Sequence, residues 1–267
     1  MKMKKLVAMV MALTAMGSVA TFSACGDTQT IEIAGSTSVQ PLMGVLADAY
    51  MAKHDDVQIK VEGGGSSIGV SNAKEGKGDF GMASKAVSET GVTAVKVCDD
   101  GIIVIVNKQS ALTDVTGVQL FDLYVSGTAL GAVTMPVTRE SGSGTRDAFE
   151  GLVKGADGTK LETVSNRAPT QEFSSTGTAM TYVEQNANAL GYISLGSYDQ
   201  KKVKKLTFEG VEATAENVKN GSYKLARPFN ILYNTEKSLS DAAQGFLDFI
   251  LSKEGQAIVA EEGYITL

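Results

Sequence analysis

Residues 132–153 read AVTMPVTRESGSGTRDAFEGLV, and this stretch contains three structural signals in a row. Its first part, 132–140, is rich in β-branched and apolar side chains and predicts a strand. The small Ser and Gly residues that follow are typical of a turn. From Gly144 onward the apolar residues recur at helical spacing, which predicts a helix. A strand that continues through a short turn into a helix is the repeating unit of an α/β protein.

The rest of the chain repeats this alternation of strands and helices. Further strands are expected at 30–35, 57–63, 79–84, 101–107, 189–195 and 227–234. Helices are expected from Pro41 onward, at 64–76 after a turn, at 115–127, at 177–186, and over 240–263 as two stretches that break near Gly255. The lysine-rich segment 201–205 is expected to be a solvated loop or a helix end. This order of elements predicts an α/β protein with mostly parallel strands.

Two apolar extended segments, 101–107 and 227–234, each end in Asn and are candidate crossing points between two lobes. Continuous apolar runs of this kind are found in strands that are covered on both faces. If the chain crosses at the first segment and returns at the second, one lobe consists of residues 28–107 with 227–267. The other lobe then consists of residues 108–226. A single doubly wound sheet is the alternative.

The N-terminal residues read MKMKKLVAMVMALTAMGSVATFSAC, with three lysines, an apolar run and small residues before Cys25. This is the pattern of a secretory signal. The ending FSAC resembles the lipobox of bacterial lipoproteins, with Phe22 where Leu is usual. We therefore predict a signal peptide over 1–24 and lipidation at Cys25; a plain signal peptide and a membrane helix are the alternatives. Several acyl chains hold a protein at a membrane surface, which predicts an extracytoplasmic location on the cell membrane.

The charge and the rare residues of the chain argue against several classes of protein. The formal net charge is −6, and it falls by three to −9 without the lysines of the predicted signal, so we expect no nucleic-acid binding. His54 is the only histidine, which argues against a His–Cys metal site and a Ser–His–Asp triad. Once Cys25 is lipidated, only Cys98 remains, so no internal disulfide can form. We expect Cys98 to be buried, and we expect a monomer without a metal or a cofactor.

Three places share one design, in which a strand leads through a Gly, Ser and Thr turn into a helix start: 34–42, 63–70 and 139–149. The first N–H groups of a helix have no partner within the helix, and the helix dipole adds positive charge there. Hydroxyl groups add donors, and Gly lets the backbone approach a ligand closely. Arg139 adds a full charge with a planar fork that suits two oxygens. Because strand ends converge in such folds, the pattern predicts a site that binds a tetrahedral oxyanion without changing it.

Other readings of these turns have less support in the sequence. Ser and Thr are also ordinary helix caps, which is the structural alternative. The stretch GGGSSIG lacks the last Gly of the dinucleotide-binding motif GxGxxG, and no P-loop motif GxxxxGK[ST] occurs. The stretch GSGTR lacks the GxSxG spacing of a hydrolase elbow. A phosphotransfer enzyme would need metal-binding carboxylates near the turn. Asp147 and Glu140 are the candidates, although we expect Asp147 to face solvent or to pair with Arg146. The polar helix start at 177–186 is interpreted as structural.

The order of these motifs resembles that of the phosphate-binding proteins of bacterial ABC importers. The matching segments are GSTSVQPL, GGGSSIGV, DFGMASKAVS, DDGIIVIVN, RESGSGTRDAF, GTAMTYVEQNANALGYIS and RPFNILYN. The resemblance covers essentially all of residues 31–267. The resemblance implies a two-lobed periplasmic-binding-protein fold of type II, each lobe a mixed sheet flanked by helices. It implies that phosphate is captured between the lobes and delivered to a permease coupled to an ATPase, without enzymatic turnover.

The resemblance also implies which residues contact the anion. These are Thr37, Ser38, Ser66, Arg139, Ser143, Gly144 and Thr145. Several relatives have an Asp that accepts the proton of hydrogen phosphate, and the matching position here is Ser84. A hydroxyl group both donates and accepts, so it discriminates less sharply, and Glu140 or Asp79 is an alternative acceptor. Sulfate, molybdate or another oxyanion therefore stays open as the ligand.

The resemblance implies that binding closes the lobes by a hinge motion near residues 107 and 227, because an anion that contacts both lobes favours the closed form. Two functions of other classes are the alternatives. One is a secreted phosphatase-like enzyme, which would need a metal or a nucleophile–base pair. The other is a sensor or adhesion lipoprotein that binds a ligand only to signal.

Overall fold

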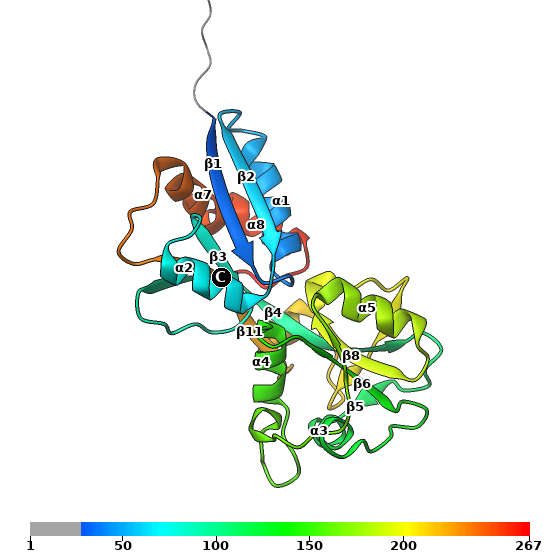
Figure 1. Cartoon of the computed structure of the whole chain (residues 1–267). Helices are drawn as coiled ribbons and strands as arrows, with labels where there is room; N and C mark the ends of the chain where they lie inside the picture. The colour runs from blue at the N-terminus through cyan, green and yellow to red at the C-terminus, as the bar shows by residue number, and fades with distance from the viewer. Residues whose placement is uncertain (1–27) are drawn as a thin grey trace, which may run out of the picture.

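The computed structural model describes residues 28–267. The predicted signal peptide, 1–24, and the predicted lipidation site, Cys25, lie outside these residues. Within the described part of the chain, no helix is both long and apolar enough to cross a membrane. The fold is α/β with two lobes, as predicted, and β4 and β11 run between the lobes (Figure 1).

A curved nine-stranded sheet connects the two lobes in the described residues. In the first lobe the strand order is β2-β1-β3-β11-β4. Strand β1 pairs in parallel with β2 and β3, and β11 is antiparallel to β3 and β4. The strands are β1 (Gln29–Gly35), β2 (Val57–Gly63), β3 (Phe80–Ala83), β4 (Val92–Asn107) and β11 (Ala226–Asn234).

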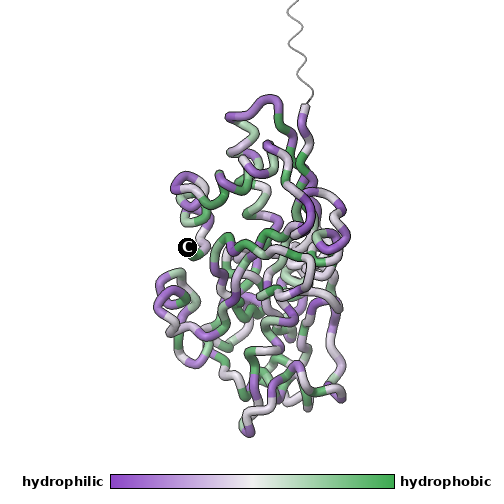
Figure 2. Tube along the Cα trace, turned by 90° about the vertical axis from the view of Figure 1, so that its left-hand side faces the viewer, coloured by the Kyte–Doolittle hydropathy of each residue, from purple (hydrophilic) through white to green (hydrophobic). Residues whose placement is uncertain are grey.

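Helices cover both faces of the first lobe's sheet. Helices α1 (Gln40–Met51), α7 (Asp241–Leu251) and α8 (Lys253–Glu261) enclose a core with Ile33 of β1. Helix α2 (Ser66–Glu75) packs on the opposite face, where its Ala73 contacts the buried side chains of β3 and β11. Along the chain trace, hydrophobic stretches run inside and hydrophilic stretches gather at the outer turns (Figure 2).

The second lobe continues the same sheet from the later part of β4. Strands β8 (Ala189–Ser194) and β9 (Val203–Lys205) are antiparallel to β4, and β6 (Met135–Arg139) is parallel to β8 and to β7 (Gln171–Phe173). Short strands β5 (Asp114–Val115) and β10 (Thr207–Phe208) form a separate pair. The helices are α3 (Gly117–Ser126), α4 (Gly144–Leu152), α5 (Thr176–Gln185) and α6 (Ala215–Lys219).

The two hydrophobic cores meet at the crossing strands. Cys98 of β4 belongs to the first core, whereas Ile102 of the same strand belongs to the second. On the return, Leu225 packs in the second core and Phe229 in the first. The side chains of the crossing strands therefore change from one core to the other between Cys98 and Ile102, and again between Leu225 and Phe229.

The structure corrects three local predictions. The strand predicted at 101–107 begins earlier, at Val92. Its first part mixes polar and apolar residues and so lacks the apolar run on which the prediction was based. The lysine-rich segment 201–205 contains strand β9, in which Val203 is buried. The two C-terminal helices break at Ser252 rather than near Gly255, because Ser252 caps α8 through its hydroxyl oxygen. Cys98 is buried, as predicted, and burial raises the pKa of its thiol.

Candidate functional site

The residues predicted to bind an anion lie where the two lobes meet. Each is at the carboxyl end of a strand or at the start of the helix that follows. From the first lobe come the turn after β1, the start of α2 and the end of β3, with Thr37, Ser38, Ser66 and Ser84. From the second lobe come the end of β6 and the start of α4, with Arg139, Ser143, Gly144 and Thr145. We call these residues, together with Ser36 and Thr176, the hydroxyl cluster.

Hydroxyl groups from the two lobes are in direct contact. The Ser38 Oγ of the first lobe lies 2.9 Å from Thr145 Oγ1 and 2.9 Å from Thr176 Oγ1 of the second. At the edge of the cluster, the Ser67 amide donates to the Gly142 carbonyl oxygen, with an N···O distance of 3.1 Å. Gly142 has a φ of 92°, which glycine adopts readily, so the tight turn before α4 brings this carbonyl against α2. The lobes are thus closed on each other at the cluster.

Arg139 contributes a guanidinium group to the hydroxyl cluster. Its side chain is 2 % exposed. Its Nη1 donates to Thr176 Oγ1 at 3.1 Å, and its Nη2 donates to Thr37 Oγ1 at 3.0 Å, so it contacts hydroxyl groups of both lobes. The Glu140 carboxylate accepts from Nε and Nη2, each at 2.9 Å. A buried charge needs such partners, and an anion would find a fixed, planar donor here.

The start of α4 adds backbone donors to the cluster. Ser143 caps this helix, with its Oγ accepting from the Arg146 amide. The amide N–H groups of Gly144 and Thr145 lie in the first turn, where they have no partner within the helix and the helix dipole is positive. A Cβ placed on Gly144 would lie 2.3 Å from Ser66 Oγ, so the helix start approaches the first lobe without room for a side chain.

Ser84 lies on the first lobe's side of the cluster and is fully buried. Its Oγ accepts from Ser36 Oγ at 2.9 Å and lies 3.3 Å from Ser66 Oγ. Its amide also donates to Ser66 Oγ at 3.1 Å. The position that holds an acceptor carboxylate in several relatives therefore holds a hydroxyl that is hydrogen-bonded to two others.

The structure separates the two carboxylates named as alternative acceptors. Glu140 lies at the cluster, because it pairs with Arg139 and its Oε1 would be 3.3 Å from a Cβ on Gly65 in the first lobe. Asp79 does not lie at the cluster. It directly precedes β3, and its Oδ2 accepts a hydrogen bond from the amide of Glu32 in β1.

Of the two expectations for Asp147, exposure to solvent and a pair with Arg146, the pair does not form, whereas the side chain is 42 % exposed. Its carboxylate pairs with Lys85 across the two lobes, not with Arg146. Arg146 instead donates to Glu150, to Glu172 and to the Arg139 carbonyl oxygen. Asp147 is therefore part of a contact between the lobes.

Thr176 belongs to the hydroxyl cluster but lies outside the three predicted turns. The helix start at 177–186 was interpreted as structural, yet Thr176, the first residue of α5, is buried and contacts both Ser38 and Arg139. The local design is the same as in the other three turns, because β7 leads through Ser175 into α5. Strand β7 spans only Gln171–Phe173, which is too short to recognise from periodicity.

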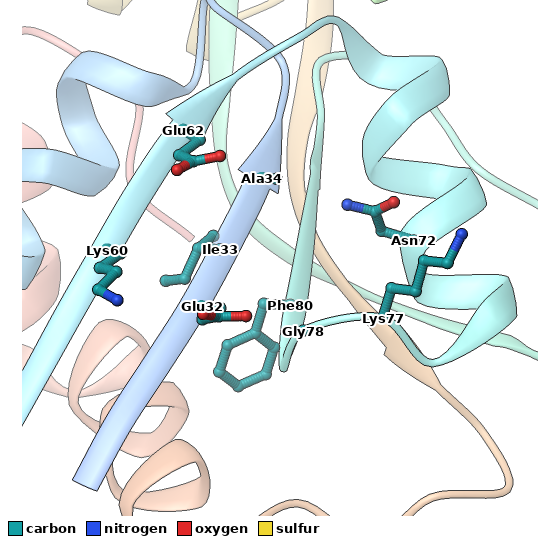
Figure 3. A pocket seen from close by; sticks show the side chains of 9 residues that line it. All are labelled: Glu32, Ile33, Ala34, Lys60, Glu62, Asn72, Lys77, Gly78 and Phe80. Carbon is teal, nitrogen blue, oxygen red and sulfur yellow. The ribbon is translucent and has the colours of Figure 1, made fainter.

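A separate pocket lies on the outer face of the first lobe, beside β1, β2 and α2 (Figure 3). Its charged side chains are those of Glu32, Glu62, Lys60 and Lys77. The two carboxylates offset the charge of the two ammonium groups, and no residue of the hydroxyl cluster lines this pocket. The hydroxyl cluster is therefore the better candidate for an oxyanion site.

Two lobes joined by extended strands, with a polar site where they meet, define a bilobal ligand-binding protein with the type II periplasmic-binding-protein fold. The chain belongs to the PBP superfamily, because residues 22–254 match the PBP superfamily domain.

Two solved structures and a curated protein that are similar to the chain have names that refer to phosphate. A putative phosphate ABC transporter substrate-binding protein from Clostridium perfringens, with bound phosphate, is 39 % identical with a TM-score of 0.82, and the match covers 90 % of this chain and 100 % of that one. An ABC-type phosphate transport receptor from Vibrio cholerae is 31 % identical with a TM-score of 0.70, and the match covers 89 % of this chain and 100 % of that one. The phosphate-binding protein PstS 2 of Streptococcus agalactiae is 44 % identical over 135 residues, which are 49 % of this chain. The chain thus spans about half the length of that curated relative, 45 %.

Proposed function

We propose that the chain is the extracytoplasmic binding protein of a phosphate ABC importer, and that it captures inorganic phosphate between its lobes for delivery to a permease and its ATPase. The observation that carries this proposal is the hydroxyl cluster. It combines one buried guanidinium, Arg139, with hydroxyl groups from both lobes and the start of α4. Donors that converge from several directions suit a tetrahedral oxyanion. The Clostridium perfringens protein that is similar over its whole length contains bound phosphate.

Phosphate would replace the contacts that the hydroxyl groups make with one another. The Ser38, Thr145 and Thr176 hydroxyl groups would turn toward the anion, and Arg139 would donate to its oxygens. Because these donors come from both lobes, the anion binds the closed form more tightly than the open form and shifts the population toward it. The pairing of Lys85 with Asp147 and of Ser67 with Gly142 would also form on closure.

Phosphate at neutral pH carries a proton, and sulfate does not. Ser84 can accept that proton in a hydrogen bond, since a hydroxyl group has two lone pairs. The Glu140 carboxylate lies at the cluster and is a second group that can accept this proton, which sulfate does not offer. We propose that these two groups favour monohydrogen phosphate over sulfate.

The proposed location follows from the N-terminal sequence. A lipid on Cys25 would hold the two lobes at the extracytoplasmic face of the cell membrane, within reach of a permease. We propose that the protein acts as a monomer, because the ligand site is assembled from two lobes of one chain.

Calorimetric titration with phosphate, sulfate and molybdate at pH 6 and pH 8 tests this function. We expect phosphate to bind and the other two anions to give weak or no heat. Binding of sulfate or molybdate as tightly as phosphate would assign another transport substrate. Silence from all three anions would overturn the proposal. A chromogenic phosphate ester should remain uncleaved with and without divalent metal, and turnover would favour the phosphatase-like alternative.

A further inference from the structure

A buried ion pair lies where the chain crosses between the lobes. Arg227, near the start of β11, donates from Nε at 3.2 Å and from Nη2 at 3.1 Å to Oδ2 of Asp100 in β4. Both side chains are 1 % exposed. Burial raises the pKa of Asp100 and lowers that of Arg227, and each charge opposes the shift of the other.

This pair contacts both lobes. On the second lobe's side, Asp100 Oδ1 accepts from the Ser194 hydroxyl at the end of β8, with an O···O distance of 2.8 Å. On the first lobe's side, Arg227 Nη1 donates to the carbonyl oxygen of Ser84 at 3.2 Å. Ser84 is the residue whose hydroxyl belongs to the hydroxyl cluster. One chain of hydrogen bonds therefore runs from the second lobe's sheet, through the crossing strands, to the backbone of the site.

A contribution to the stability of the fold does not by itself explain why this ion pair is buried. Removing two charges from water is costly, and well-packed apolar residues often replace a buried pair with equal or greater stability. A role in holding a functional group of the site in place is a more specific explanation for the pair. The backbone after β3 is held by β11 twice, since Asn230 Nδ2 donates to the carbonyl oxygen of Lys85 at 2.8 Å.

We propose that Arg227 and Asp100 are positioning residues for the oxyanion site, with Arg227 holding the Ser84 backbone so that the Ser84 hydroxyl faces the anion. Asp100 orients the Arg227 guanidinium and links it to Ser194 of the second lobe. This inference rests on the proposed function, because it assigns a role in anion binding. Neither residue contacts the anion in this proposal.

A double-mutant cycle tests the inference, with phosphate affinity measured by calorimetry. In the native background we expect Ser84→Ala to weaken phosphate binding by about tenfold or more, the usual value of one hydrogen bond to a charged ligand. In an Arg227→Met background, where the Ser84 carbonyl oxygen has lost its guanidinium donor, we expect Ser84→Ala to change the affinity by less than about twofold. Arg227→Lys keeps the positive charge but loses the planar guanidinium that donates to Asp100 and Ser84 together. It provides a second background if Arg227→Met does not fold.

Ser38→Ala is the matched control, because it removes a cluster hydroxyl from a turn that Arg227 does not hold. We expect it to weaken binding by the same factor in both backgrounds. An equal effect of Ser84→Ala in both backgrounds would assign Arg227 a merely structural role and overturn the inference while phosphate binding stands. A Ser84→Ala effect below about twofold in the native background would overturn it as well. Failure of the unmodified protein to bind phosphate would instead reject the proposed function, and the inference with it.

Discussion

Arg139→Ala is expected to weaken phosphate binding by roughly 10-fold to 150-fold, because the anion loses a charge-assisted contact worth about 1.5–3 kcal/mol. The Arg139 side chain is buried and contacts hydroxyl groups of both lobes. Its removal also leaves the Glu140 carboxylate without its partner beside the site. That negative charge would repel phosphate, so we expect the loss to lie toward the upper end of the range. Calorimetric titration measures the change.

Lys160→Ala is the control for the lost charge. Lys160 is in the same lobe, exposed and paired with Glu162 at the surface. Its removal changes the net charge by the same amount, and we expect the phosphate affinity to change by less than about twofold, because exposed charges are screened. Wild-type affinity in Arg139→Ala would show that the anion does not bind at Arg139.

Gly144→Ala is expected to weaken phosphate binding by at least about tenfold while the protein stays folded. The new Cβ would lie 2.3 Å from Ser66 Oγ and 2.8 Å from Ser84 Oγ, both in the opposite lobe. Either the lobes stay apart or these hydroxyl groups rotate away from the anion, and both outcomes remove donors from the site. Ala is a better helix former than Gly, so α4 itself should not lose stability. Calorimetry measures the affinity, and small-angle X-ray scattering with phosphate measures the closure.

Gly177→Ala is the matched control, since Gly177 lies near the start of α5 and a Cβ there meets nothing within 4 Å. We expect this variant to bind phosphate and to close like the unmodified protein. If Gly144→Ala binds phosphate as tightly as Gly177→Ala, then the close approach of α4 to Ser66 is not needed for binding.

The sequence predicts the local units of this fold well, because they depend on neighbouring residues. The turn at 139–149 combines a strand, an Arg, small residues and a helix start, and each of these signals is local. Strand ends converge in α/β folds, so Ser38, Ser66 and Arg139 could be grouped before their contacts were known. The structure brings these three residues together with the others of the hydroxyl cluster.

The contacts that could not be predicted from the sequence depend on how segments that are distant in the chain pack together. Thr176 joins the cluster because β7, a three-residue strand, pairs with β6 and directs α5 toward Ser38. The contact of Arg227 with Asp100 depends on the register of β11 against β4. The pairing of Asp147 with Lys85 depends on how the two lobes close. None of these contacts leaves a periodic or local pattern in the chain.

The most direct test of the account is a crystal structure of the protein with arsenate, a phosphate analogue whose anomalous scattering locates the anion. The account predicts one arsenic peak between the lobes, within hydrogen-bonding distance of Arg139, the start of α4 and the Ser38 turn. A bound arsenate elsewhere, such as the outer pocket of Figure 3, with the hydroxyl cluster unchanged, would contradict it.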